Sequence, residues 1–139
     1  MELDTNTEFG ARVARRLDED EVVWLTTVSA NETPQPSPVW FLWDGAIIRI
    51  FSQPGTPKLQ NIARSPRVSL HLNSDAFGGD IVIITGDARI VEDGAPANAV
   101  PEYIAKYADG IQRIGMTPET FSQAYSTPIQ ITPRSLRGF

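Results

Sequence analysis

The chain has 139 residues, no cysteine, one histidine, and 12 basic against 17 acidic side chains, for a formal net charge of −5 at pH 7. This length suits one domain, and the cysteine count excludes disulfides, iron–sulfur clusters and thiolate zinc sites. An acidic balance without a basic cluster disfavours nucleic-acid binding, and one histidine disfavours a metal site. Because the sequence shows neither a long apolar run nor the features of a signal peptide, we expect no membrane partner and a cytoplasmic location.

A helix is predicted over residues 5–19. Thr5-Asn6-Thr7-Glu8 has the spacing of a capping box, in which a hydroxyl and a carboxylate satisfy free amide groups at the start of a helix. Phe9, Val13 and Leu17 then recur every four residues and mark one apolar face.

The following segments are predicted as strands. Val22–Val28 is rich in β-branched residues, and Pro36–Trp43 follows as a second strand whose two prolines exclude full pairing on both sides. Asp44-Gly45 separates this strand from the apolar segment Ala46–Phe51. An Asp-Gly pair between apolar runs predicts a tight hairpin.

The periodicity then changes to that of a short helix. Thr56-Pro57-Lys58 supplies an N-cap threonine and a proline at the first helical position, and Ser65-Pro66 indicates the helix end. Two further strands are predicted at Arg67–Leu72 and Ile81–Val91, the second with a bulge or bend at Gly86.

The last third of the chain is predicted as a helical insert over about residues 96–126, followed by a strand over about residues 128–136. In the insert, Val100, Ile104 and Tyr107 are expected on one apolar face. About six antiparallel strands with short helices make a mainly β chain. This pattern favours one small β-barrel domain that spans residues 1–139.

The first candidate site is the segment from Ser52 to Lys58, with Asn61 one turn later. A strand ends and a helix begins there, so free backbone N–H groups and the positive end of the helix dipole can bind an anion. Ser52 and Thr56 add hydroxyl donors, and Lys58 adds a full charge. The alternative interpretation is a well-capped helix with a solvated lysine.

The second candidate site is Ser37-Pro38-Val39-Trp40 with the aromatic residues up to Trp43. A proline in a strand leaves an open edge, and the aromatic rings offer a flat surface to a planar ligand. A barrel core with one aromatic residue at a dimer contact fits the same pattern. His71 is more typical of a structural residue. Because no catalytic triad, carboxylate pair or metal motif is present, a bound cofactor is expected to supply any chemistry.

Three segments in a fixed order and spacing resemble a known family: Pro36–Gly45, Thr56-Pro57-Lys58 with Asn61, and Ser65–Leu70. Through them the chain, from about Glu21 to Gly138, resembles the pyridoxamine 5'-phosphate oxidase-like split-barrel superfamily of flavin and deazaflavin proteins. Within that superfamily it is most similar to the actinobacterial branch of probable coenzyme F420-dependent enzymes.

The resemblance implies an FMN-binding split barrel that forms a homodimer, with a flavin-type cofactor in a cleft at the dimer interface. It implies that Thr56 and Lys58 contact the cofactor phosphate and that the segment from Ser37 to Trp40 lies along the ring system. The implied cofactor-binding residues are Ser37, Pro38, Val39, Trp40, Ser52, Gln53, Thr56, Pro57, Lys58 and Asn61. Catalytic residues stay unassigned.

The cofactor implied by the resemblance is coenzyme F420, with FMN as the alternative. FMN-dependent oxidases of the family grip the phosphate with an arginine and a lysine before the hairpin, and Pro38–Trp43 contains neither. The implied reaction is hydride transfer from reduced F420 to an unidentified small organic acceptor. Two other functions stay open: an FMN-binding oxidoreductase of the same fold, and a non-catalytic protein that binds a flavin, haem or a similar ligand.

Overall fold

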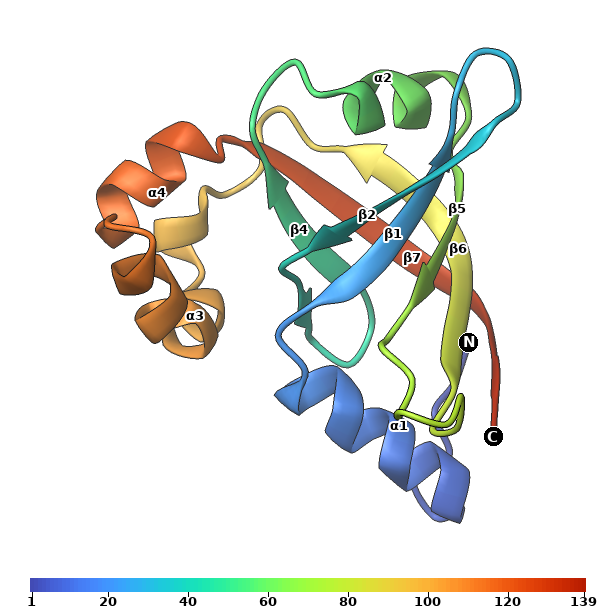
Figure 1. Cartoon of the computed structure of the whole chain (residues 1–139). Helices are drawn as coiled ribbons and strands as arrows, with labels where there is room; N and C mark the ends of the chain where they lie inside the picture. Colours follow the sequence, from blue (N-terminus) through green and yellow to red (C-terminus); the bar gives the residue numbers. More distant parts are fainter.

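The computed structural model describes all 139 residues, and Figure 1 shows the arrangement of its elements. The elements are α1 (Glu8–Glu19), β1 (Val23–Val28), β2 (Pro34–Val39), β3 (Leu42–Trp43), β4 (Ile48–Ser52), α2 (Pro57–Arg64), β5 (Arg67–His71), β6 (Val82–Ile90), a 3-10 turn (Ala97–Ala99), α3 (Pro101–Arg113), α4 (Pro118–Ala124) and β7 (Thr127–Gly138).

The seven strands form one antiparallel sheet in the order β2-β1-β5-β6-β7-β4-β3. The sheet curls into a half-barrel, with α1 below it and α2 above it in Figure 1. The β6–β7 ladder changes register between Thr85 and Gly86, which confirms the predicted bulge. A Cβ atom at Gly86 would lie 2.6 Å from the carbonyl oxygen of Thr132, so this close approach of two strands needs a glycine.

The predicted number of strands is wrong. There are seven strands rather than about six, because the predicted strand Pro36–Trp43 is divided into β2 and β3. At the break, the backbone N–H of Phe41 donates to the Tyr107 hydroxyl, and its carbonyl accepts from Lys106 Nζ, in place of strand partners.

The hairpin at Asp44-Gly45 is confirmed between β3 and β4, although its turn extends to Ile47.

The chain is also mixed α/β rather than mainly β, because α1, α2, α3 and α4 together are nearly as extensive as the strands. Helix α1 begins later than predicted. Its N-cap is Thr7, whose hydroxyl accepts from the N–H of Gly10 at 3.0 Å. The Thr7 N–H and hydroxyl both donate to the carbonyl of Asp4, so a separate turn precedes the helix and Thr5 takes no part in a capping box.

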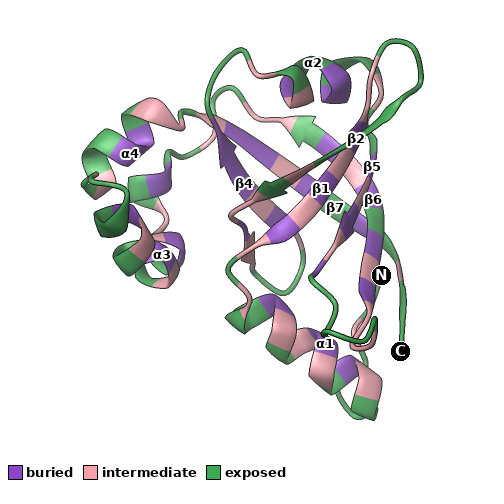
Figure 2. Ribbon diagram, in the orientation of Figure 1, coloured by how far each residue is buried: buried purple, intermediate pink, exposed green.

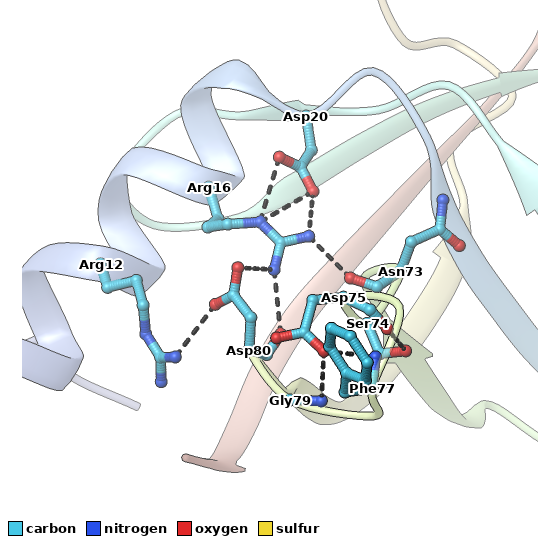
Figure 3. Close-up of polar contacts among 9 residues, drawn as sticks. All are labelled: Arg12, Arg16, Asp20, Asn73, Ser74, Asp75, Phe77, Gly79 and Asp80. Carbon is cyan, nitrogen blue, oxygen red and sulfur yellow. Dashed lines mark hydrogen bonds and ion pairs between the residues drawn. The ribbon is translucent and has the colours of Figure 1, made fainter.

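Charged contacts attach α1 to the loop between β5 and β6 (Figure 3). Arg16 pairs with Asp20, the C-cap residue of α1, and with Asp80 in the loop, and it also donates to the carbonyl of Asn73. Arg12 donates to the other side of the Asp80 carboxylate at 3.0 Å. The helix therefore lies against one end of the barrel, opposite α2.

The apolar residues form two clusters, and Figure 2 shows buried residues on the inner faces of the strands and helices. The larger cluster fills the half-barrel and includes residues of α1 and α2. The smaller one lies between β4 and the insert and consists of Phe51, Ala97, Tyr103, Tyr107, Ile111 and Phe121. The buried face of α3 is thus Tyr103, Tyr107 and Ile111, rather than the face predicted from Val100, Ile104 and Tyr107. No helix has the length and apolar character needed to cross a membrane.

Candidate functional site

A cleft of about 380 Å³ lies where the barrel meets the helical insert. Strands β2 and β4, the start of α2, and helices α3 and α4 all contribute to it. Its lining residues are Val22, Pro38, Val39, Trp40, Ile50, Phe51, Ser52, Gln53, Thr56, Lys58, Tyr103, Ile114, Phe121 and Tyr125. Nine of these 14 residues are hydrophobic. Four polar ones, Ser52, Gln53, Thr56 and Lys58, lie close together in the sequence at the end of β4 and the start of α2.

The polar end of the cleft is built by the connection between β4 and α2. Ser52 is the last residue of β4, and its hydroxyl lies 3.1 Å from the hydroxyl of Thr56, the N-cap residue of α2. Gly55 between them has φ +75, a left-handed conformation that favours glycine. The strand thus turns sharply into the helix, and two hydroxyl groups meet at the helix N-terminus.

Helix α2 begins without a side-chain cap. The Thr56 side chain makes no capping hydrogen bond, Pro57 has no N–H, and the N–H of Lys58 has no protein acceptor. Free amide groups and the helix dipole make such an end favourable for an anion. The predicted N-cap position is therefore confirmed, while the capping bond itself is missing.

Helix α4 shows the opposite arrangement with the same Thr-Pro start. Thr117 accepts from the N–H of Thr120, and the Thr120 hydroxyl accepts from the N–H of Thr117, which completes a capping box. The second position after the cap is Glu119 in α4 and Lys58 in α2. The threonine side chain thus caps α4. At α2 the Thr56 hydroxyl makes no such bond, and Thr56 and Lys58 line the cleft instead.

Lys58 is the only charged residue among those that line the cleft. It is half-buried, and burial lowers the pKa of its ammonium group below the usual range. None of the ion pairs in the structure involves Lys58. A partly desolvated cation without a counter-ion is a group that an anionic ligand would stabilise.

The other end of the cleft is aromatic. The Trp40 ring is stacked on Tyr107 at a centroid distance of 4.7 Å and on Phe121 at 5.7 Å. Phe121 is stacked in turn on Tyr125 at 4.5 Å. A Cβ atom at Gly110 would lie 3.0 Å from the Trp40 ring, so α3 approaches this ring closely. Of these four stacked rings, Trp40, Phe121 and Tyr125 line the cleft and give this end an apolar, aromatic character.

A family profile described as Pyridoxamine 5'-phosphate oxidase matches residues 9–134. The chain belongs to this family. The match covers the half-barrel, the insert and both ends of the cleft. Among curated proteins no sequence match is found.

Solved structures with the same fold belong to proteins with different functions. An F420 reductase has a TM-score of 0.66 at 21% identity, over 88% of this chain and 94% of that chain. A pyridoxamine 5'-phosphate oxidase-type protein from Listeria innocua has a TM-score of 0.69 at 23% identity, over 91% of this chain and 94% of that chain. A heme storage protein from Vibrio cholerae has a TM-score of 0.65 at 17% identity, over 99% of this chain and 95% of that chain. At these identities the likeness establishes the split-barrel fold and leaves the ligand open.

Most of the site residues that were predicted from the sequence lie in the cleft. Seven of them line the cleft: Pro38, Val39, Trp40, Ser52, Gln53, Thr56 and Lys58. Ser37, Pro57 and Asn61 are not among the lining residues. Ser37 is half-buried on β2 opposite Leu25 of β1, and Pro57 is exposed at the start of α2.

Asn61 is occupied by structural contacts. Its side-chain amide donates to Thr27 of β1 at 3.0 Å and to Gln35 of β2 at 2.9 Å, and its carbonyl accepts from Arg64 at 2.9 Å. The side chain is buried, so these bonds attach α2 to two strands. Asn61 therefore orients the helix that presents Lys58.

Sequence reasoning did not predict the lining residues Val22, Ile50, Phe51, Tyr103, Ile114, Phe121 and Tyr125. The aromatic residues of the insert have the spacing of an ordinary apolar helix face, and nothing local distinguishes a face that packs on a core from one that borders a cleft. His71 stacks on Trp24 at 6.2 Å and is not a lining residue. This position agrees with the structural interpretation of that histidine.

Proposed function

We propose that this protein is a deazaflavin-dependent oxidoreductase, which transfers a hydride from reduced coenzyme F420 to a small organic acceptor. The observation that supports this most directly is the two-ended cleft. One end offers the free N–H of Lys58, its unpaired ammonium group and two hydroxyls that bond to each other, and the other end is aromatic. A cofactor with a phosphate and a planar ring matches both ends.

The single charge in the cleft favours F420 over FMN. FMN ends in a phosphate monoester, which carries close to two negative charges at neutral pH, whereas the phosphodiester of F420 carries one. Lys58 is the only charged lining residue, and Pro38–Trp43 adds no arginine or lysine. At the phosphate position itself, this one lysine and the helix dipole match the charge of a phosphodiester more closely than that of a phosphate monoester.

The residues of the chain bind and orient, and the bound cofactor supplies the hydride. In this proposal Lys58 and Thr56 hold the phosphate, Ser52 supports Thr56 through their shared hydrogen bond, and Val39 and Trp40 flank the ring. Once a second copy closes the cleft, the apolar lining would exclude water from the face where an acceptor is stacked. No side chain of the cleft is assigned as a proton donor.

A homodimer is part of the proposal. Pro38, Gln53 and Ile114 line the cleft and are exposed to solvent in the single chain. A second copy placed over them would close the cleft and complete the site. Light scattering after gel filtration measures the mass in solution, and a monomer at micromolar concentration would contradict this part of the proposal.

The test is a parallel titration of cofactor-stripped protein with F420, FMN and haem, followed by absorbance and fluorescence. Stronger binding of F420 than of FMN supports the proposal and justifies a screen of electron-poor acceptors with reduced F420. Preferential binding of FMN would instead assign the protein to the flavin-dependent members. Preferential binding of haem, or of F420 without turnover of any acceptor, would favour a binding protein.

A further inference from the structure

Tyr103 has a buried hydroxyl group with no hydrogen-bond partner. The residue is 0% exposed, and its hydroxyl is the one buried side-chain polar atom in the structure that lacks a partner. An unsatisfied buried hydroxyl is costly, and such groups in native proteins usually have a functional partner or a bound water. Tyr103 also lines the cleft, although solvent does not reach it. It therefore lies at the inner end of the cleft.

The next tyrosine along the same face of α3 shows that this environment can satisfy a hydroxyl. The hydroxyl of Tyr107 lies 2.7 Å from the carbonyl of Glu21 and 2.9 Å from that of Phe41, and it accepts from the N–H of Phe41 at 2.8 Å. The two rings are 4.8 Å apart. Tyr107 thus has a full set of partners inside the protein, while Tyr103 has none.

The surroundings of Tyr103 are aromatic and fixed. Its ring meets the edge of Phe51 at 4.8 Å and lies 6.0 Å from Phe121. Phe51 directly precedes Ser52 on β4, so the tyrosine lies close to the polar end of the cleft. Burial raises the pKa of the phenol above its usual value of about 10, so the group keeps its proton at physiological pH. It is therefore available as a hydrogen-bond donor.

We propose that the Tyr103 hydroxyl donates a hydrogen bond to an acceptor on the planar ring of the bound ligand, a carbonyl oxygen or an unprotonated ring nitrogen. This rests on the proposed function to the extent that a heterocyclic cofactor occupies the cleft. The hydroxyl selects rings with an acceptor at their inner edge, while Lys58 selects the phosphate. Tyr103 is in this sense a specificity-determining residue of the cleft that acts on the ring, whereas Lys58 acts on the phosphate.

The experiment compares Tyr103→Phe with Lys58→Met, and for each protein measures binding of two probes. One probe is F420, or FMN if the wild-type protein prefers it. The other is the same ring system without its phosphate, the deazaflavin riboside or riboflavin. Tyr103→Phe should weaken both probes by about tenfold, because the variant loses the hydrogen bond to the ring, which both probes share. Lys58→Met should weaken only the phosphate-bearing probe.

Melting of the ligand-free proteins gives a second, independent readout. Tyr103→Phe removes an unsatisfied group and should leave the melting temperature unchanged or raise it, whereas Tyr107→Phe should lower it. If Tyr103→Phe melts lower and binds both probes as the wild type does, a buried water satisfies the hydroxyl and the inference is wrong. If the wild-type protein binds neither ring, the proposed function fails, and this assignment of Tyr103 fails with it.

Discussion

Tyr107 connects the helical insert to the barrel, and Tyr107→Phe tests how much this connection stabilises the fold. The residue is 1% exposed, and its hydroxyl accepts from the backbone N–H of Phe41 at the break between β2 and β3. Phe41 is fully buried, so its N–H reaches no solvent once the hydroxyl is removed. The phenylalanine ring keeps the stacking on Trp40, so the variant isolates the hydrogen bonds.

The expected loss of stability is about 2 kcal/mol. A buried donor left without an acceptor costs about 1–3 kcal/mol, and the carbonyl of Glu21 also loses a donor at 2.7 Å. The carbonyl of Phe41 keeps Lys106 at 3.0 Å, which limits the total. An unfolding entropy of about 2.1 cal/mol/K per residue then gives a decrease in melting temperature of about 7 °C for a chain of this length.

Calorimetry and urea unfolding of the wild type, Tyr107→Phe and Tyr125→Phe measure this loss. Tyr125 is a matched control, because it is half-exposed and its hydroxyl has no protein partner. Its variant should change the unfolding free energy by less than about 0.5 kcal/mol. Equal, small losses in the two variants would show that water replaces the Tyr107 hydroxyl, and the assigned role of this contact would be wrong.

Three further predictions concern the cleft and the connections around it. Lys58→Met should weaken a phosphate-bearing ligand by tenfold or more, because charge-assisted hydrogen bonds contribute about 1.5–3 kcal/mol, while the melting temperature should not fall. Asn61→Ala should lower the unfolding free energy by about 1–3 kcal/mol in urea, because it leaves Thr27, Gln35 and Arg64 without their shared partner. Burial lowers the pKa of Lys106 to about 8 in the folded protein, so the unfolded chain binds more protons above that pH. The unfolding free energy of the wild type relative to Lys106→Met should therefore rise between about pH 8 and pH 10.5, and a flat difference would contradict this assignment.

Local signals in the sequence predicted the elements that depend on local chemistry. The bulge at Gly86, the hairpin at Asp44-Gly45 and the position of α2 after Thr56 are all present in the structure. Each follows from a residue type that restricts the backbone within a few positions, such as glycine at a close approach or proline at a helix start. The family was predictable for a related reason, because segments of this kind recur in a fixed order.

Features that depend on distant partners could not be predicted. The division of Pro36–Trp43 into two strands depends on Tyr107, 66 residues away in the sequence from Phe41. The two Thr-Pro helix starts are alike in sequence, yet only Thr117 forms a capping bond. The resemblance implied Asn61 as a neighbour of the cofactor, and no local signal in the sequence indicated its contacts with two strands. In all three cases tertiary contacts decided the role.

The insert between β6 and β7 has a consequence for how this protein can change. Helices α3 and α4 lie beside the barrel in Figure 1, and β6 and β7 are paired along their length without them. The polar end of the cleft comes from β4 and α2, whereas the aromatic end comes largely from the insert. Substitutions in residues 97–125 can therefore alter the aromatic end while the polar end around Lys58 stays constant. The two halves of the cleft can evolve at different rates, which gives one scaffold access to many ligands.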